Sequence, residues 1–412
     1  MEVQDLKGQK VMMAVSGGLD SCTITHWLTG HGVEVIGYTA DLGQPDEQDI
    51  EDIRQRMLAC GAAHMILADL KSAICQAGIQ VIQSMARYEG GYWNTTGIAR
   101  HVVVEGMIAA LRQHGITVAG HGATGRGNDQ VRFQLATQML DPRIRVYAPW
   151  RDSAFLRAFG GRREMIDYCE RHDLPITASR EKPYSTDANI LGLTHEAGEL
   201  EALSTPARRI DPGMGVFPEQ APDSPEVFTV RFEHGQPVSC NDTTVDPRTA
   251  FVLSNQIAGR HGVGIGLHTV ENRFVGIKSR GVYEAPGMEL LGTCYTYLLQ
   301  LVLDRRARRL FEPISALLAE QIYQGYWFDT ASQAAWKAVE HINQLATGTI
   351  SVALYRGNIT FHAAEDVPHT LYSEDTASME AIGDFDHRDS EGFLGVLGVG
   401  VRALSTSGQV RR

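Results

Sequence analysis

The sequence predicts an α/β protein in which a domain built on a parallel sheet precedes an α+β domain. Short apolar runs alternate with helical stretches through the first 150 residues, as expected for a parallel sheet with crossover helices. A glycine-rich turn joins the first apolar run, 11–15, to the first helical stretch, 22–28. Beyond residue 150 the pattern changes to helices and hairpin signals such as the turn at Gly357-Asn358.

We expect three segments: a parallel-sheet domain (1–165), an α+β domain (166–375) and a C-terminal oligomerisation tail (376–412). In the first, further strands are expected at 33–38, 64–67, 117–119 and 145–148, and helices at 47–60, 74–85 and 96–113. In the second, helices are expected at 163–172, 247–260, 288–303 and 330–345. Its expected strands are 175–178, 227–232, 237–240, 268–277, 350–354 and 359–361, whereas 182–199 is polar and is expected to be irregular.

Composition excludes several classes of function. The formal net charge of −12 argues against nucleic acid as a main partner, because no basic surplus is available to neutralise phosphates. The six cysteines contain no Cys-x-x-Cys pair, so we expect no zinc site and assign no residue as a metal ligand. The N-terminus is polar, and no apolar run reaches the roughly eighteen residues that a membrane span needs. We therefore expect a cytoplasmic protein that does not bind a membrane.

The turn 16–21 has the chemistry of a phosphate site. Gly17 and Gly18 leave backbone N–H groups bare at the positive end of a helix, and Ser16 and Ser21 add hydroxyl groups. The turn lacks the Gly-Lys-Ser/Thr of the Walker loop and the Gly-x-Gly-x-x-Gly of dinucleotide-binding proteins. The alternative is a plain glycine turn with a capped helix, and Asp20 would either cap that helix or bind Mg²⁺.

Three further polar stretches are candidates for binding. Parallel strands end at one edge of a sheet, so 16–21, 39–44 and 120–128 are expected to converge on one pocket. In 121–133, Asp129 can accept hydrogen bonds from an amine and Arg132 can grip a carboxylate. The stretches 182–196 and 270–284 carry many hydrogen-bonding and charged groups. The alternatives are a flexible loop, a solvated surface loop and exposed strand-pair charges, respectively.

The turn SGGLDS resembles the PP-loop, SGGxDS, of ATP pyrophosphatases, which cleave ATP into AMP and pyrophosphate. Along nearly its whole length the chain resembles the argininosuccinate synthase family. The matching blocks are AVSGGLDS (14–21), YTADLGQ (38–44), HGATGRGNDQVRF (121–133), APWR (148–151), KPYSTDANILGLTHEAG (182–198), VENRFVGIKSRGVYEAPG (270–287) and GFLGVLG (392–398).

The resemblance implies ATP-dependent ligation of citrulline and aspartate in arginine biosynthesis, with Mg²⁺ and a homotetrameric assembly. It also implies that 1–165 is a PP-loop nucleotide-binding domain and that 166–375 is a synthetase domain that binds citrulline and aspartate. Asp129, as a weak candidate for a base, and Ser185 would be the catalytic residues. ATP would contact Ala14, Val15, Ser16, Gly17, Gly18, Leu19, Asp20, Ser21, Cys22, Ala40, Gly122 and Asp187. Citrulline would contact Tyr92, Asn128, Arg132, Ser185, Thr194, Glu196, Glu271 and Tyr283, and aspartate would contact Thr124, Asn128 and Asp129.

The residue types fit these substrates. Citrulline is a zwitterion, so its site needs a cation, an acid and hydrogen bonds for the ureido group. Arg132, Glu271 and the Ser185/Thr194 pair are of those types. Two segments depart from the commoner pattern of the family. The usual Asp-Thr-Ser is Asp20-Ser21-Cys22 here, so Ser21 keeps a hydroxyl and Cys22 replaces a serine. Gly97 replaces a citrulline-contacting serine for which Thr95 or Thr96 can substitute.

Three other functions stay open. A paralogue could ligate a different ureido or amine compound by the same chemistry. A tRNA-modifying or amidotransferase-type adenylase would share the PP-loop, but the chain lacks cysteine pairs and is acidic. A catalytically silent nucleotide-binding subunit would be expected to lose loop glycines or binding charges, whereas Gly17, Gly18, Arg132 and Glu271 are all present.

Overall fold

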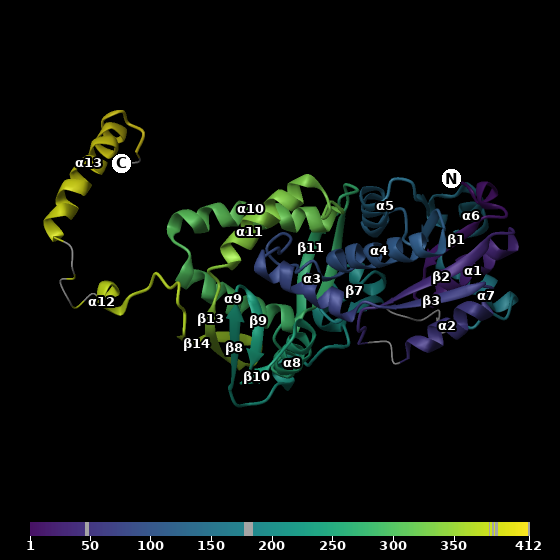
Figure 1. Ribbon diagram of the computed structural model, residues 1–412, viewed down its shortest axis with the longest axis horizontal. Coiled ribbons are helices and arrows are strands. Elements are labelled where there is room, and N and C mark those ends of the chain that lie inside the picture. The colour runs from purple at the N-terminus through teal and green to yellow at the C-terminus, as the bar shows by residue number, and fades with distance from the viewer. Residues whose placement is uncertain (46–48, 177–183, 379, 381–382, 384–385, 411–412) are drawn as a thin grey trace.

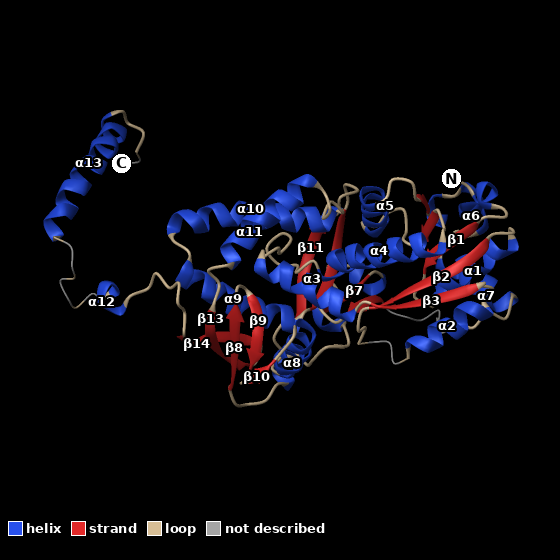
Figure 2. Ribbon diagram, viewed as in Figure 1, coloured by secondary structure: helices blue, strands red, loops and turns tan. Residues whose placement is uncertain are grey.

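The computed structural model describes residues 1–45, 49–176, 184–378, 380, 383 and 386–410. The molecule has an elongated body, with the N-terminal sheet at one end and the C-terminal tail projecting beyond the other (Figure 1). Helices flank the N-terminal sheet, and two further sheets lie in the middle and at the far end of the body (Figure 2).

The N-terminal sheet is parallel throughout, as predicted. It consists of β1 (Lys10–Ala14), β2 (Glu34–Asp41), β3 (His64–Asp69), β4 (Val118–His121) and β5 (Arg145–Tyr147), in the order β3-β2-β1-β4-β5. Because β1, β2 and β4 are neighbours and run the same way, the stretches that follow them leave the sheet at one edge.

Helices cover both faces of this sheet because side chains alternate along each strand. Met13 of β1 belongs to a core shared with α1 (Leu19–Gly30), α2 (Ile50–Ala59) and α7 (Arg162–Arg171). Met12 faces the other way, into a core shared with α3 (Lys71–Gln83), α4 (Thr95–His114) and α5 (Asp129–Leu140). The short α6 (Ser153–Ala158) adds Phe155 to the first core. The division at residues 165 and 375 stays a prediction.

The rest of the body contains two antiparallel sheets. One has the order β10-β9-β8-β13-β14, with β8 (Glu226–Glu233), β9 (Gln236–Cys240), β10 (Thr243–Thr244), β13 (Gly348–Tyr355) and β14 (Asn358–Glu365). The other has the order β11-β12-β7-β6, with β6 (Ser185–Asn189), β7 (Gly192–Glu196), β11 (Ile265–Asn272) and β12 (Lys278–Glu284). The helices of this part of the body are α8 (Pro247–Arg260), α9 (Pro286–Val302), α10 (Arg305–Gln324) and α11 (Thr330–Asn343). Short 3-10 turns are η1 (Val3–Leu6), η2 (Pro149–Arg151), η3 (Gly198–Glu201), η4 (Ala207–Arg209) and η5 (Pro218–Gln220).

The structure corrects three expectations. The stretch 182–199, expected to be irregular, contains the β6–β7 hairpin, because β7 pairs with the distant β12. The strand expected at 268–277 ends at Asn272, and a second strand follows the turn. The helix α10 was not expected. Of the strand expected at 175–178, residues 177–178 lie outside the described residues, as do Glu47 and Gln48 of the helix expected at 47–60.

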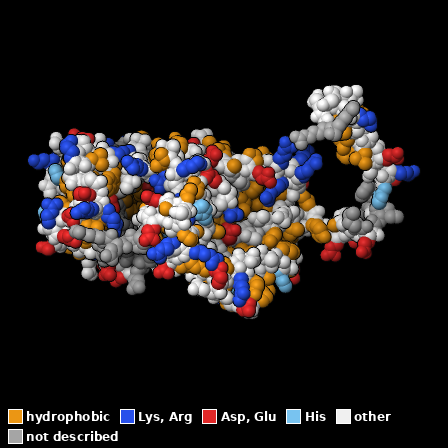
Figure 3. Space-filling model, turned by 180° about the vertical axis from the view of Figure 1, so that it is seen from behind, with side chains coloured by type: hydrophobic (Ala, Val, Ile, Leu, Met, Phe, Trp, Pro, Cys, Tyr) orange, Lys and Arg blue, Asp and Glu red, His pale blue; other side chains and the backbone are white. Residues whose placement is uncertain are grey.

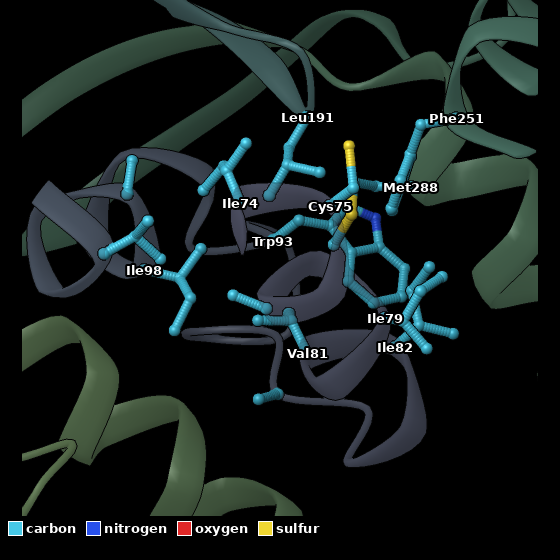
Figure 4. Packing of buried hydrophobic residues seen from close by; sticks show 14 of the residues in the cluster. Ile74, Cys75, Ile79, Val81, Ile82, Trp93, Ile98, Leu191, Phe251 and Met288 are labelled. Carbon is cyan, nitrogen blue, oxygen red and sulfur yellow. The ribbon is translucent and has the colours of Figure 1, made fainter. Parts of the chain in front are cut away.

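A large apolar core joins the two halves of the body. In Figure 4, Cys75 and Ile79 of α3 lie close to Trp93, Phe251 of α8 and Met288 of α9. Gly78 has no room for a side chain, because an added Cβ would lie 2.5 Å from Leu191 and 2.9 Å from Phe251. Close approach of α3 to Leu191 and α8 therefore fixes the β6–β7 hairpin against the half of the body that contains the parallel sheet.

The tail is separate from this core. It contains α12 (Glu374–Ala377) and α13 (His387–Thr406), and no described residue of either helix is buried. Apolar side chains of α13 are largely exposed, with Phe393 at 65% and Val396 at 75%. Figure 3 shows these apolar side chains on the projecting segment. Among the described residues, no helix combines the length and apolarity that a membrane crossing requires.

Candidate active site

Hydrogen bonds with α1 and α2 fix the conformation of the loop between β1 and α1. Gly17 has a φ of +71°, in the left-handed region, and an added Cβ would lie 3.1 Å from Ile53. The backbone N–H of Ser16 donates to Ser21 Oγ at 3.0 Å, and Arg56 donates to the Gly17 carbonyl oxygen at 2.9 Å. These bonds fix the turn at the helix N-terminus, where backbone dipoles favour an anion.

The second glycine-rich loop lies beside the first. An added Cβ at Gly122 would be 3.3 Å from Ile24 of α1 and 3.8 Å from Asp20 Cβ. Trp150 donates its indole N–H to Asp20 Oδ1 at 3.1 Å, and burial raises the Asp20 pKa. Gly18 is the N-cap of α1, so the hypothesis that Asp20 caps this helix is wrong. These contacts join two of the stretches expected to converge.

A half-buried chain of alternating charges runs from the second loop to β6. Arg100 of α4 donates to Asp129 Oδ2 at 3.0 Å and also to Asp187 Oδ2. Arg132, one turn after Asp129 on α5, donates to Asp129 Oδ1 at 2.9 Å. Arg100 thus links the residue expected to meet aspartate with the residue expected to meet ATP.

Burial and charge act on these carboxyl groups differently. Burial opposes ionisation of Asp129, but Arg100 and Arg132 outweigh it and hold its pKa at about 2. Burial raises the Asp187 pKa, which Arg100 only partly offsets. Burial also raises the Glu196 pKa, against the effect of Arg273, whose guanidinium lies 3.4 Å from Glu196 Oε2.

A cation and an acid stand at opposite sides of Tyr323, in the last turn of α10. Arg132 donates through Nε to the Tyr323 carbonyl oxygen at 2.9 Å, and the Tyr323 hydroxyl donates to Glu271 Oε2. Both Arg132 and Glu271 are buried. Burial raises the Glu271 pKa to about 7 despite the hydrogen bond from Tyr323 and the nearby positive charge of Arg132.

Aromatic and hydroxyl groups lie next to this pair. Tyr92 and Tyr283 stack with ring centroids 4.4 Å apart. Tyr283 is paired with Thr194 across β12 and β7, and the Thr194 hydroxyl lies 3.1 Å from the Thr96 hydroxyl. Tyr283 and Thr194 lie on the β11-β12-β7-β6 sheet, whereas Tyr92 lies just before α4 and Thr96 lies on α4, so aromatic rings and hydroxyl groups from two elements meet here.

Not every predicted site residue joins this cluster. Asn128 does, because its side chain is hydrogen-bonded to the Tyr323 side chain, while its Oδ1 accepts a hydrogen bond from the Phe274 backbone N–H at 2.9 Å. Ser185 and Thr124 are exposed, and Ala40 is buried within β2. The other predicted loop positions (Ala14, Val15, Leu19 and Cys22) lie on β1, α1 and the loop between them, where the Cys22 thiol donates to the Gly17 carbonyl oxygen at 3.6 Å. Lys182 and Pro183 lie outside the described residues.

An apolar cavity of about 310 Å³ lies away from this cluster. Gly43, Ile190, Met214 and Val252 contribute to its lining. Only Gly43 comes from the stretches expected to converge, 16–21, 39–44 and 120–128. The charged cluster carries the chemistry, so we place the candidate active site there.

Comparison with known protein families gives matches over most of the chain. The arginosuccinate synthase N-terminal HUP domain matches residues 10–175, and the arginosuccinate synthase C-terminal domain matches residues 184–404. The chain belongs to the argininosuccinate synthase family.

Curated argininosuccinate synthases are similar at full length. The Rhodopirellula baltica protein is 42% identical over 390 residues, covering 94% of this chain and 96% of that protein. The Moorella thermoacetica protein is 38% identical, covering 96% of each chain, and the Thermotoga maritima protein is 37% identical, covering 94% and 95%.

The structure accounts for one departure from the commoner argininosuccinate synthase pattern. An added Cβ at Gly97 would lie 3.2 Å from Ile322 of α10, so a serine there would press on that helix. The adjacent Thr96 places its hydroxyl beside Thr194 instead. Of the two candidate substitutes, Thr96 therefore has the better position, since Thr95 is buried and its carbonyl oxygen accepts from Asn189.

Sequence reasoning missed two residues of this cluster. Arg100 follows Thr96 by four residues, and this helical spacing was the signal that both face the same side of α4. Tyr323 gave no signal, because α10 itself was not expected. Asp304, which caps α10, and the apolar spacing of Phe311, Leu318 and Ile322 could have revealed that helix.

Proposed function

We propose that the chain ligates citrulline and aspartate to argininosuccinate, converting ATP to AMP and pyrophosphate. The observation that carries the proposal is the pairing of Arg132 with Glu271 across Tyr323. A cation and an acid so placed suit the carboxylate and ammonium of one amino acid. Membership of the family supports ATP as the nucleotide.

The ATP assignment follows the glycine loop. We propose that Ala14–Cys22, Ala40 and Gly122 hold ATP and that Asp187 also contacts it. The bare N–H groups of the turn and the N-terminus of α1 support the phosphate part. Mg²⁺, which would offset pyrophosphate charge, would be held mainly by phosphate oxygens and the Asp20 carboxylate, because the described residues contain no metal-binding cluster.

The citrulline assignment rests on the residues around Tyr323. We propose that Arg132 binds the carboxylate, that Glu271 binds the ammonium, and that Asn128 contacts both amino acids. Tyr92, Ser185, Thr194, Glu196 and Tyr283 would complete the site around the ureido group and side chain. The stacked tyrosines and the hydroxyl of Thr194 support this assignment.

The aspartate assignment places Thr124, Asn128 and Asp129 around the second amino acid. With a pKa of about 2, Asp129 is a carboxylate at neutral pH and a weak base. We therefore propose that Asp129 orients the attacking amine by accepting its hydrogen bond. Ser185 would donate a hydrogen bond to the ureido group as it becomes activated.

Two displacements complete the proposed reaction. The ureido oxygen attacks the α-phosphorus of ATP, and the bond to the bridging oxygen breaks, giving citrullyl-AMP and pyrophosphate. The aspartate amine then attacks the ureido carbon, AMP leaves with the former ureido oxygen, and the amine loses a proton. The chain contributes mainly orientation, because three substrates must meet in one site.

Assembly and location are further parts of the proposal. We propose a homotetramer in which the tail, 376–412, contacts other subunits, and a cytoplasmic location. The exposed apolar side chains of α13, which include Phe393 and Val396, support a role in association because large exposed apolar patches commonly mark interfaces.

Pyrophosphate release from Mg-ATP tests the function directly. Citrulline and aspartate would be added separately and together, with argininosuccinate detected by mass spectrometry. Turnover that requires citrulline, followed by argininosuccinate formation with aspartate, supports the proposal. Turnover only with another ureido or amine compound would establish the paralogue instead. Tight ATP binding without turnover with any acceptor would establish a silent nucleotide-binding subunit.

A further inference from the structure

Tyr323 occupies a fixed position between three segments of the active site. It lies at the end of α10, one residue after Ile322, whose carbonyl oxygen lies 3.1 Å from His101 Nε2 of α4. Its side chain is fully buried and stacks on Tyr88 with ring centroids 3.6 Å apart. The Tyr88 hydroxyl in turn donates to the Asn272 carbonyl oxygen at 2.8 Å. The ring therefore has little freedom to move.

The backbone carbonyl oxygen and the phenol hydroxyl of Tyr323 both contact charged residues of the site. Its carbonyl oxygen accepts from Arg132 Nε at 2.9 Å, and the Arg132 guanidinium lies 5.0 Å from the Tyr323 ring centroid. Its hydroxyl donates to Glu271 Oε2. A single residue thus holds the cation through its backbone and its ring, and the acid through its phenol.

We propose that Tyr323 is a positioning residue that sets the spacing of Arg132 and Glu271 and keeps Glu271 ionised for the ammonium of citrulline. The proposal rests on the proposed function, which gives Arg132 and Glu271 their roles. Tyr323 acts through them, and it is not a catalytic residue.

The phenol matters because several groups act on the Glu271 carboxyl. Burial raises its pKa to about 7, and Glu196 of β7 acts in the same direction. The hydrogen bond from Tyr323 and the charges of Arg132 and Arg273 lower it. Removing the phenol removes a lowering contribution, so the Glu271 pKa should rise further. Less carboxylate would then be available to the ammonium near neutral pH.

Tyr323→Phe is the test, because it removes the hydroxyl and leaves the ring and the carbonyl oxygen in place. We expect the citrulline KM at pH 7 to rise about tenfold, with kcat at saturating citrulline changed by less than about threefold. The citrulline KM should fall as Glu271 ionises, and in Tyr323→Phe this fall should occur at a higher pH than in the native protein. The aspartate KM should stay near that of the native protein.

Tyr295→Phe is the matched control. The Tyr295 hydroxyl is also buried and donates to Asn343 Oδ1 at 2.7 Å, but Tyr295 packs against Phe232 of β8. Its loss costs a buried hydrogen bond without touching Glu271. The control should therefore leave the pH dependence of the citrulline KM in place.

An infrared titration without substrates separates this proposal from the proposed function. The Glu271 carboxyl band is identified as the band lost in Glu271→Gln, and its titration midpoint is compared in native and Tyr323→Phe proteins. An upward shift supports the proposal, and an unchanged midpoint overturns it. A native protein that fails to consume citrulline overturns the proposed function, while the titration still reports whether Tyr323 controls Glu271.

Discussion

Arg100 holds two carboxylates together, and its removal tests whether the charge cluster is one coupled unit. Its guanidinium lies 3.0 Å from Asp129 and also contacts Asp187. Changing Arg100→Gln leaves both acids in place without their shared cation. We expect the free energy of unfolding to fall, and we expect the loss to depend on the presence of Asp187.

The magnitude follows from the partial burial of the cluster. Side-chain exposure is 19% for Arg100, 27% for Asp129 and 33% for Asp187. Breaking a fully buried pair costs about 3–5 kcal/mol, whereas an exposed pair contributes about 0–1 kcal/mol. The present exposure places the loss at about 3 kcal/mol. Asp187→Asn in the same chain should recover about 1 kcal/mol by removing one of the two facing like charges.

Urea unfolding of the native protein, both single variants and the double variant measures this coupling at a fixed protein concentration. Without Arg100, the folded-state pKa of Asp187 should rise further above its unfolded value. A raised carboxyl pKa contributes stability that is complete below about pH 4 and is lost as pH rises through the folded pKa. The deficit of Arg100→Gln should therefore grow from pH 4 to pH 7. Additive effects in the double variant, with a deficit independent of pH, would refute this reasoning.

Three further changes have defined outcomes. Gly17→Ala should raise the ATP KM and lower the free energy of unfolding by about 1–2 kcal/mol, because the φ of Gly17 is +71° and Ile53 is close. Activity at increasing ATP measures the first effect, and urea unfolding measures the second. Gly292→Ala should cost about 1–3 kcal/mol in urea unfolding, because the added carbon would overlap Trp93. Deleting 387–412 should lower the assembly mass measured by light scattering, and an unchanged mass would show that the tail does not assemble subunits.

The first half of the fold was predictable because local pattern and topology agree there. Apolar runs bounded by glycine turns predicted all five parallel strands, with ends displaced by up to three residues. The hairpin at 185–196 was not predictable in the same way. Its strands contain polar residues that face the site, such as Thr194, so the usual alternation of apolar and polar residues is absent. Its stability comes from pairing with β12, almost ninety residues away in sequence.

The chemical types of the site residues could be predicted from the sequence better than the contacts between those residues. The residues Asp129, Arg132 and Glu271 could be chosen from charge and position, and the structure brings them together. Local spacing could place Arg100 on the same side of its helix as Thr96, but it could not pair Arg100 with Asp129. Tyr323 could not be chosen at all, because a hydrogen bond between distant elements leaves no trace in local spacing. The backbone carbonyl that holds Arg132 is invisible to any argument from side-chain type.

Each of the three arginines in the cluster is already paired with a carboxylate, and this pairing affects which substrates can bind. Arg100 and Arg132 share Asp129, and Arg273 is paired with Glu196. A lone substrate anion would have to compete with a carboxylate already in place, at a cost in desolvation. A zwitterion brings an ammonium together with its carboxylate, so it can pair with both Arg132 and Glu271 and leaves the net charge of the site unchanged. This balance favours an amino acid over a simple acid as the first acceptor.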